Sequence, residues 1–182
     1  IYTTETGRYQ VTIIINMCNI HLTLSNDEYK LANKIRNFHG TYKERTDFIV
    51  NSSIDKDYLE IYAKYNKHYQ EAKELETLKR IIFIQWYSFI EPIAFTGIGN
   101  LDEELTKANL LILIGLIKDH ALDDEFKRMT FHYYSVTDYY FNQNFDFIPS
   151  IQIIERNNKK PVPASVNRGQ MGEYWNSISF TN

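Results

Sequence analysis

Apolar side chains recur every three or four positions through much of the chain, which is the spacing of one face of a helix. Many Lys and Glu residues stand between them, as on the solvated side of an amphipathic helix. The longest such series falls within residues 55–92 and consists of Tyr58, Tyr62, Tyr65, Tyr69, Ala72, Leu75, Leu78, Ile82, Trp86 and Phe89. One unbroken helix here would have about 35 residues, against a mean near 12, so we expect a kink or a break within it.

Two further helices are predicted after Pro92. Asn100 has the side chain of an N-cap residue, and the acidic residues that follow it suit a first helical turn. The pattern then continues into the apolar run at residues 110–117, for which a buried strand is the alternative. Asp123 is predicted to cap the next helix, whose core stripe consists of Phe126, Met129, Tyr133, Val136 and Tyr140.

The first forty residues show a different pattern. Residues 20–24 alternate Ile, Leu and Leu with His and Thr, which is typical of a half-buried strand, and residues 9–15 are also rich in β-branched side chains. We expect these two segments to pair as a hairpin that turns at residues 16–19. Ser25 and Glu28 then form the spacing of a capping box, which predicts a helix that begins there and ends at Gly40.

The C-terminal part has fewer helix signals. Residues 145–155 are apolar and include Pro149, which favours an extended strand or a packed arm. Tyr174, Trp175 and Phe180 give the tail enough apolar surface to dock on the body or on a partner. We therefore predict a mainly α fold, either a helical bundle or a short helical solenoid, with a small N-terminal β-hairpin and an extended C-terminal arm. The helical domain would span residues 1–145 and the arm residues 146–182.

Composition narrows the classes of function. The 182 residues include 20 Lys and Arg against 23 Asp and Glu, a formal charge of −3 at pH 7, which argues against a dedicated nucleic-acid surface. Cys18 is the single cysteine, so no internal disulfide is possible and a reducing compartment, the cytoplasm, is expected. Uninterrupted apolar stretches fall short of the roughly 20 residues that span a membrane, and no span is expected.

Motifs for nucleotides and metals are weak. Gly97-Ile98-Gly99 lacks the remaining glycines of a phosphate-binding loop, and we interpret it as a turn between two helices. Oxygen ligands and one imidazole gather at Asp119, His120, Asp123, Asp124 and Glu125, which makes this segment a candidate metal cluster. The alternative is a loop whose acids stabilise the next helix at its N-terminus. No cofactor is predicted from any motif.

One pair of residues suggests catalysis. Arg128 and His132 are four positions apart in a predicted helix and therefore share a face. A cation beside an imidazole can bind a phosphodiester and move its proton. The pair resembles the motif of the HEPN family of helical ribonucleases, which places Arg four to six residues ahead of His; here only three residues separate them. The resemblance is confined to this motif and implies metal-independent RNA cleavage. The structural alternative is that both residues flank Tyr133 of the core stripe.

The sequence favours a non-catalytic protein-binding domain. A mildly acidic, Tyr-rich helical protein suits protein recognition, because Tyr and Trp give large contact areas at low entropic cost and surface acids attract basic partners. The expected partner is another protein. The chain would act as an immunity or inhibitor protein that occludes a toxin or enzyme, or as an accessory subunit, and the HEPN-like ribonuclease is the alternative.

Overall fold

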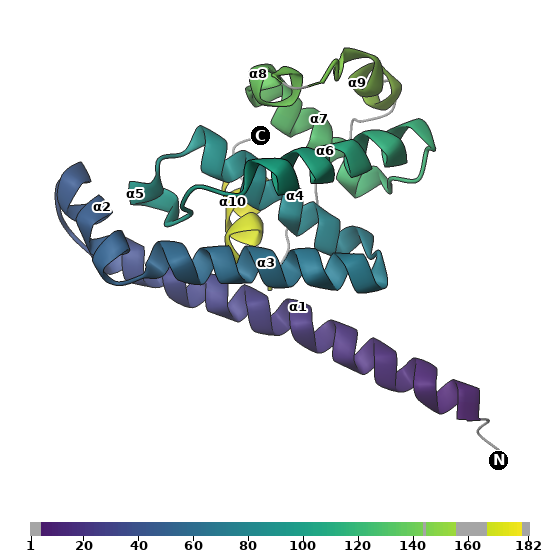
Figure 1. Ribbon diagram of the computed structural model, residues 1–182, viewed down its shortest axis with the longest axis horizontal. Coiled ribbons are helices and arrows are strands. Elements are labelled where there is room, and N and C mark those ends of the chain that lie inside the picture. The colour runs from purple at the N-terminus through teal and green to yellow at the C-terminus, as the bar shows by residue number, and fades with distance from the viewer. Residues whose placement is uncertain (1–4, 144, 156–166, 180–182) are drawn as a thin grey trace.

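The computed structural model describes the backbone of residues 5–143, 145–155 and 167–179 and, within these ranges, the side chains of residues 20–154 and 167–178. The described residues form helices and no strand, so the mainly α prediction is confirmed (Figure 1). The helices are α1 (Glu5–Asn37), α2 (Tyr42–Asn51), α3 (Ile54–Ala72), α4 (Leu75–Ile90), α5 (Ile93–Thr96), α6 (Glu103–Lys118), α7 (Asp124–Val136), α8 (Asp138–Asn142), α9 (Ile148–Glu155) and α10 (Gly169–Ser179).

The predicted N-terminal β-hairpin is wrong, because both of its strands lie inside the single helix α1. The physical reason is that a short alternating pattern also places two of its apolar residues four positions apart, which is the spacing of one face of a helix. Ile20 and Leu24 are one turn apart and share a face: Ile20 packs partly buried against the core and Leu24 is buried within it. Leu22, between them, points away and is 43% exposed. Leu31 and Ile35 continue the buried stripe of α1.

The helix start predicted at Ser25 is also wrong. Ser25 and Glu28 stand in the middle of α1 and are both buried, at 2% and 1% exposure. The two residues are therefore buried polar side chains inside a helix, and their spacing does not mark a helix end. A capping box does occur at Thr41, whose side chain accepts from the backbone N–H of Glu44 and starts α2.

The long tyrosine-rich series breaks, as its length predicted. Lys73 takes the left-handed backbone conformation with φ of 54°, which ends α3, and α4 begins at Leu75. The stripe faces the core along most of both helices, although its last residue, Phe89, is 43% exposed. Its four leading tyrosines, Tyr58, Tyr62, Tyr65 and Tyr69, are no more than 4% exposed. α3 and α4 pack against each other along this stripe.

The later helices follow the predicted pattern with three changes. The stripe expected from Phe126 to Tyr140 is divided, because α7 ends at Val136, which is 53% exposed, and Tyr140 lies in α8. Residues 110–117 belong to α6, so the strand alternative for this run is wrong. The cap of α6 is Asp102, two residues after the predicted Asn100, and its Oδ1 accepts from the N–H of Leu105 at 2.7 Å. Asp123 caps α7 as predicted, through its Oδ1 and the N–H of Phe126.

The C-terminal part is helical where the structure describes it. Residues 148–155 form α9, so the extended strand expected there is wrong; Pro149 lies in the first turn, where its missing N–H costs no helical hydrogen bond. α10 packs on α1 and α4 of the same chain, and Trp175 Nε1 donates to the hydroxyl of Tyr133 at 3.0 Å. Phe180 lies outside the described residues, and the boundary at residue 145 stays a prediction.

The helices enclose one aromatic core. Trp86 of α4 stacks on Tyr133 of α7 with ring centroids 4.4 Å apart, and both side chains are fully buried. The first helix contacts α10, the last described one, as well as α3 and α5, which favours a bundle over a solenoid in which each unit touches only its neighbours (Figure 1). In the part of the chain that the structure describes, no helix is both long and apolar enough to cross a membrane.

Candidate functional site

A groove runs along the side of the molecule where α2 ends, α3 begins, α4 ends and α6 begins. It consists of two adjoining pockets with volumes of about 540 and 340 Å³, which share Ser88, Phe89, Gly99 and Asn100. The other lining residues are Val50, Asp55, Gln85, Ile90, Glu91, Pro92, Ile93, Ile98, Leu101, Glu103 and Thr106.

The wall between α5 and α6 depends on two glycines. Gly97 has a φ of 73°, and a Cβ there would lie 2.4 Å from Ile35 Cδ1, so only glycine lets the loop press this closely on α1. Gly99 faces Asp55, where an added Cβ would be 3.3 Å from the Asp55 Cβ. Gly97-Ile98-Gly99 is therefore the turn between two helices that the sequence predicted, and it shapes the groove.

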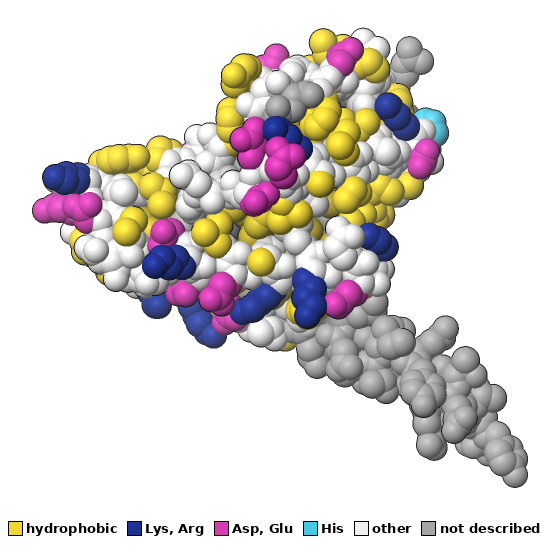
Figure 2. Space-filling view, viewed as in Figure 1, with side chains coloured by type: hydrophobic (Ala, Val, Ile, Leu, Met, Phe, Trp, Pro, Cys, Tyr) yellow, Lys and Arg dark blue, Asp and Glu magenta, His cyan; other side chains and the backbone are white. Residues whose placement is uncertain are grey.

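Large apolar side chains of the groove remain in contact with solvent. Val50 is 50% exposed and Phe89 is 43% exposed, although both adjoin a buried floor that includes Ile98. The Phe89 ring also lies beside Tyr139 and Tyr140, with centroids 6.3 and 5.1 Å away, and Tyr139 is 66% exposed. The apolar surface therefore continues from the groove onto α8. Figure 2 shows hydrophobic side chains beside both acidic and basic ones on the face of the molecule that it draws.

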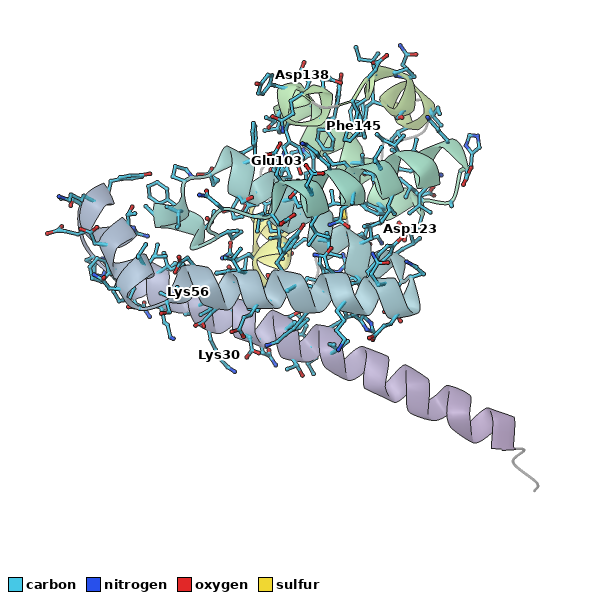
Figure 3. All side chains as sticks on the ribbon, viewed as in Figure 1. Lys30, Lys56, Glu103, Asp123, Asp138 and Phe145 are labelled. Atoms are coloured by element: carbon cyan, nitrogen blue, oxygen red, sulfur yellow. The ribbon has the colours of Figure 1, made fainter. Side chains whose placement is uncertain are left out.

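The charges of the groove have one sign. Asp55, Glu91 and Glu103 contribute carboxylates, and no Lys, Arg or His is found among the described residues that line it. Glu103 lies at the beginning of α6 (Figure 3), where its 78% exposed side chain binds Lys107 at 2.7 Å. Asp55 Oδ1 is shielded from solvent and has no hydrogen-bond partner among the described residues. A buried acceptor without a donor costs free energy that a partner's donor would recover.

The structure gives His132 a packing role. Its Nε2 lies 2.6 Å from the Tyr174 hydroxyl, and its ring contacts those of Trp86 and Trp175. Burial lowers the pKa of His132 below its usual value. Arg128, on the same helix, has a buried Nε without a hydrogen-bond partner among the described residues. His132 is thus held between α4, α7 and α10.

Two acids of the predicted metal cluster, Asp123 and Asp124, have other side-chain partners. Asp123 caps α7 and its Oδ2 accepts from Lys79 Nζ at 2.7 Å, in agreement with the alternative that an N-terminal acid stabilises this helix. Asp124 pairs with Lys127, and Asp119 is the C-cap of α6. His120 follows in the left-handed conformation, with φ of 54°.

A third pocket, of about 460 Å³, lies between α6, α7 and α9. It is lined by Ile117, His120, Leu122, Lys127, Pro149, Gln152, Ile153 and Ile154. Its described lining residues include no carboxylate, unlike those of the groove at α4, which combines three carboxylates with exposed Phe89.

Sequence reasoning missed the groove as a site. Only its glycine turn was noted, because the lining residues come from five separate segments and none forms a local motif. A usable signal was present in the apolar Phe89 and Ile90 followed directly by Glu91 and Pro92 at a helix end. No protein-family model, no curated protein and no solved structure matches this chain. The groove's own chemistry is the basis for the function proposed below.

Proposed function

We propose that the chain is a non-catalytic protein-binding domain whose groove holds a partner segment that carries basic side chains next to apolar ones. One observation carries this proposal: the groove combines exposed Phe89 and Val50 with three carboxylates. None of its described lining residues is a Lys, Arg or His. Either role expected from the sequence, an inhibitor that occludes a toxin or enzyme or an accessory subunit, would use such a surface.

The apolar residues would supply most of the affinity. Burial of apolar surface is worth about 25 cal/mol per Å², and aromatic side chains in a central pocket tend to dominate binding energy. Phe89 is already supported by Tyr140, which is buried, so its ring is held in place before a partner arrives. A preformed aromatic contact lowers the entropic cost of association.

The carboxylates would select the partner and its orientation. An excess of carboxylates, which Lys107 beside Glu103 offsets only in part, attracts a basic segment, raises its association rate and disfavours acidic competitors. Asp55 adds a more specific requirement, because its unpartnered Oδ1 gains a donor only if a Lys, Arg or amide of the partner reaches it. A purely apolar segment would leave this oxygen unsatisfied.

Selection from a displayed library of random short peptides tests the proposal. We expect enriched peptides to place Lys or Arg beside an aromatic or branched apolar residue, and we expect their binding to shift backbone NMR signals of residues 88–91 and 98–103. Enrichment of acidic peptides, or shifts confined to another face of the protein, would contradict the proposal.

A further inference from the structure

His21 of α1, His68 of α3 and Glu74, the residue before α4, meet at the far end of α4 from the groove. His68 Nε2 lies 3.2 Å from Glu74 Oε2, and His21 Nε2 lies 3.5 Å from the same oxygen. One ligand atom from each of the three residues lies within 4.8 Å of the other two. No other such trio of His, Cys, Asp or Glu side chains is found in the described part of the chain.

The break between α3 and α4 builds this cluster. Lys73 is held in the left-handed conformation, a cost that non-glycine residues pay only where the surrounding structure requires it. The turn brings Glu74 back beside His68, one and a half turns earlier in sequence, while α1 supplies His21. The two imidazole rings meet edge to face at 5.5 Å. The side chains of His21, His68 and Glu74 are only 15%, 11% and 25% exposed.

We infer that His21, His68 and Glu74 form a binding site for a divalent transition-metal ion of the Zn²⁺ class. Tetrahedral Zn²⁺ with bonds of about 2.0–2.1 Å holds its nitrogen and oxygen ligands roughly 3.3 Å apart. The two measured separations from Glu74 Oε2 bracket that value. Two imidazoles disfavour Mg²⁺ and Ca²⁺, which take oxygen ligands.

Two neighbours bear on metal binding at this cluster. Thr77 Oγ1 is 2.8 Å from His21 Nε2, so coordination by this nitrogen would replace that hydrogen bond. Arg80 Nη1 donates to the backbone oxygen of His21, and the Nε of Arg80 pairs with Glu76 Oε1 at 3.0 Å, which offsets part of its positive charge near the cluster. Bound metal would join α1, α3 and α4.

Titration of Zn²⁺ and Co²⁺ into the metal-free Cys18→Ser protein tests the inference, and this variant removes the only thiol. We expect one Zn²⁺ per chain, a rise in melting temperature on binding and, with Co²⁺, the visible absorption of a tetrahedral or five-coordinate site. Loss of a partner outside the coordination sphere already costs about 10–100-fold in affinity, so His68→Gln and Glu74→Gln should weaken binding by at least that much. His39→Gln is the matched control, because His39 is exposed and remote in sequence.

A second measurement needs no substitution. Modification of histidines by diethyl pyrocarbonate, read by mass spectrometry, should slow at His21 and His68 when Zn²⁺ is present and stay unchanged at His39 and His120. Three results would each overturn the inference: equal Zn²⁺ affinity in His68→Gln and in the parent protein, absence of Zn²⁺ binding by the parent, or modification of His21 and His68 that is the same with and without Zn²⁺.

Discussion

Tyr65 donates its hydroxyl hydrogen to Glu28 Oε1 across 2.8 Å, and neither side chain is more than 1% exposed. Arg80 Nη1 donates to the same hydroxyl at 3.0 Å, and the backbone N–H of Gln170 donates to Glu28 Oε2. One carboxyl group thereby connects α1, α3, α4 and α10. Burial raises the pKa of Glu28 from 4.5 to about 7, although Tyr65 and Arg80 act to lower it.

This raised pKa predicts a pH dependence of stability. Because the pKa of Glu28 is higher in the folded than in the unfolded chain, its contribution is fully present below about pH 4.5 and is lost as the pH rises through 7. The loss amounts to about 3 kcal/mol between pH 4 and pH 8. Glu28→Gln keeps the shape and removes the titration, so its stability relative to the parent should rise by about that amount over this range. Urea unfolding of both proteins at each pH measures the difference, and a constant difference would contradict the prediction.

Glycine substitutions should have opposite effects at two positions. Gly169 has a φ of 55°, and an added Cβ would lie 2.4 Å from the oxygen of buried Glu28, so Gly169→Ala should destabilise the fold by about 2 kcal/mol or more. Gly115 is inside α6, and its added Cβ would meet no atom within 4 Å. Gly115→Ala should therefore stabilise by roughly 0.5–1 kcal/mol. Thermal unfolding compares the two, and a stable Gly169→Ala protein would show that Glu28 does not hold the α10 start.

Glu125 should stabilise the fold at neutral pH and lose this effect in acid. Burial raises its pKa, but hydrogen bonds from Arg168 and Lys79 outweigh this and lower the pKa to about 2. A lowered folded-state pKa gives stability that is present above pH 4.5 and is lost as the pH falls towards 2. After solvent screening, we expect Glu125→Gln to cost about 1–2 kcal/mol at pH 7. The cost should vanish near pH 2.

Asp124→Asn is the matched control for Glu125, because it changes the neighbouring acid, whose side chain is 82% exposed and pairs only with Lys127 among the described residues. Denaturant unfolding at pH 7 and at acid pH should separate the two variants. Equal loss in both would show that the ion pairs of Glu125 with Lys79 and Arg168 contribute little.

The ribonuclease alternative makes a separate prediction for His132. If Arg128 and His132 cleave RNA, the protein degrades a mixed RNA substrate in the presence of a metal chelator, and His132→Ala abolishes this activity. The hydrogen bond of His132 to Tyr174 and its aromatic surroundings lead us to expect intact RNA with the parent protein. Gel analysis at micromolar protein measures it. RNA cleavage that persists in the presence of the chelator and disappears in His132→Ala would refute a purely structural role for His132.

Local sequence predicted α3, α4, α6 and α7 for a clear physical reason. The Tyr58 to Tyr69 stripe alternates with Lys and Glu over about three turns, so burial and solvation agree on the helical period. Asp123 could be predicted as an N-cap because its side-chain oxygen accepts a hydrogen bond from a backbone N–H nearby in sequence, that of Phe126. In contrast, Leu22 lies between Ile20 and Leu24, and three apolar residues at alternate positions fit a strand as well as one helical turn.

The sites could not be predicted from local patterns. Ser25 and Glu28 have capping-box spacing, but their partners are Arg80, Tyr65 and Gln170, far away in the chain. His21 and His68 are likewise 47 positions apart, and only the packing of α1 on α3 brings them together. Interactions between such distant residues depend on tertiary packing, and tertiary packing cannot be inferred from a helical period or from a cap residue.

Two neighbouring glutamates allow a direct test of whether the acidic, apolar groove binds a basic segment. Glu103 lines the groove whereas Glu104 does not, yet both are in the first turn of α6 and both bind Lys107. Affinity for the best library-selected peptide, measured by fluorescence anisotropy, should fall on the order of tenfold in Glu103→Lys and remain near the parent value in Glu104→Lys. Added salt should narrow this difference. Equal affinities of the two variants at low salt would contradict the account.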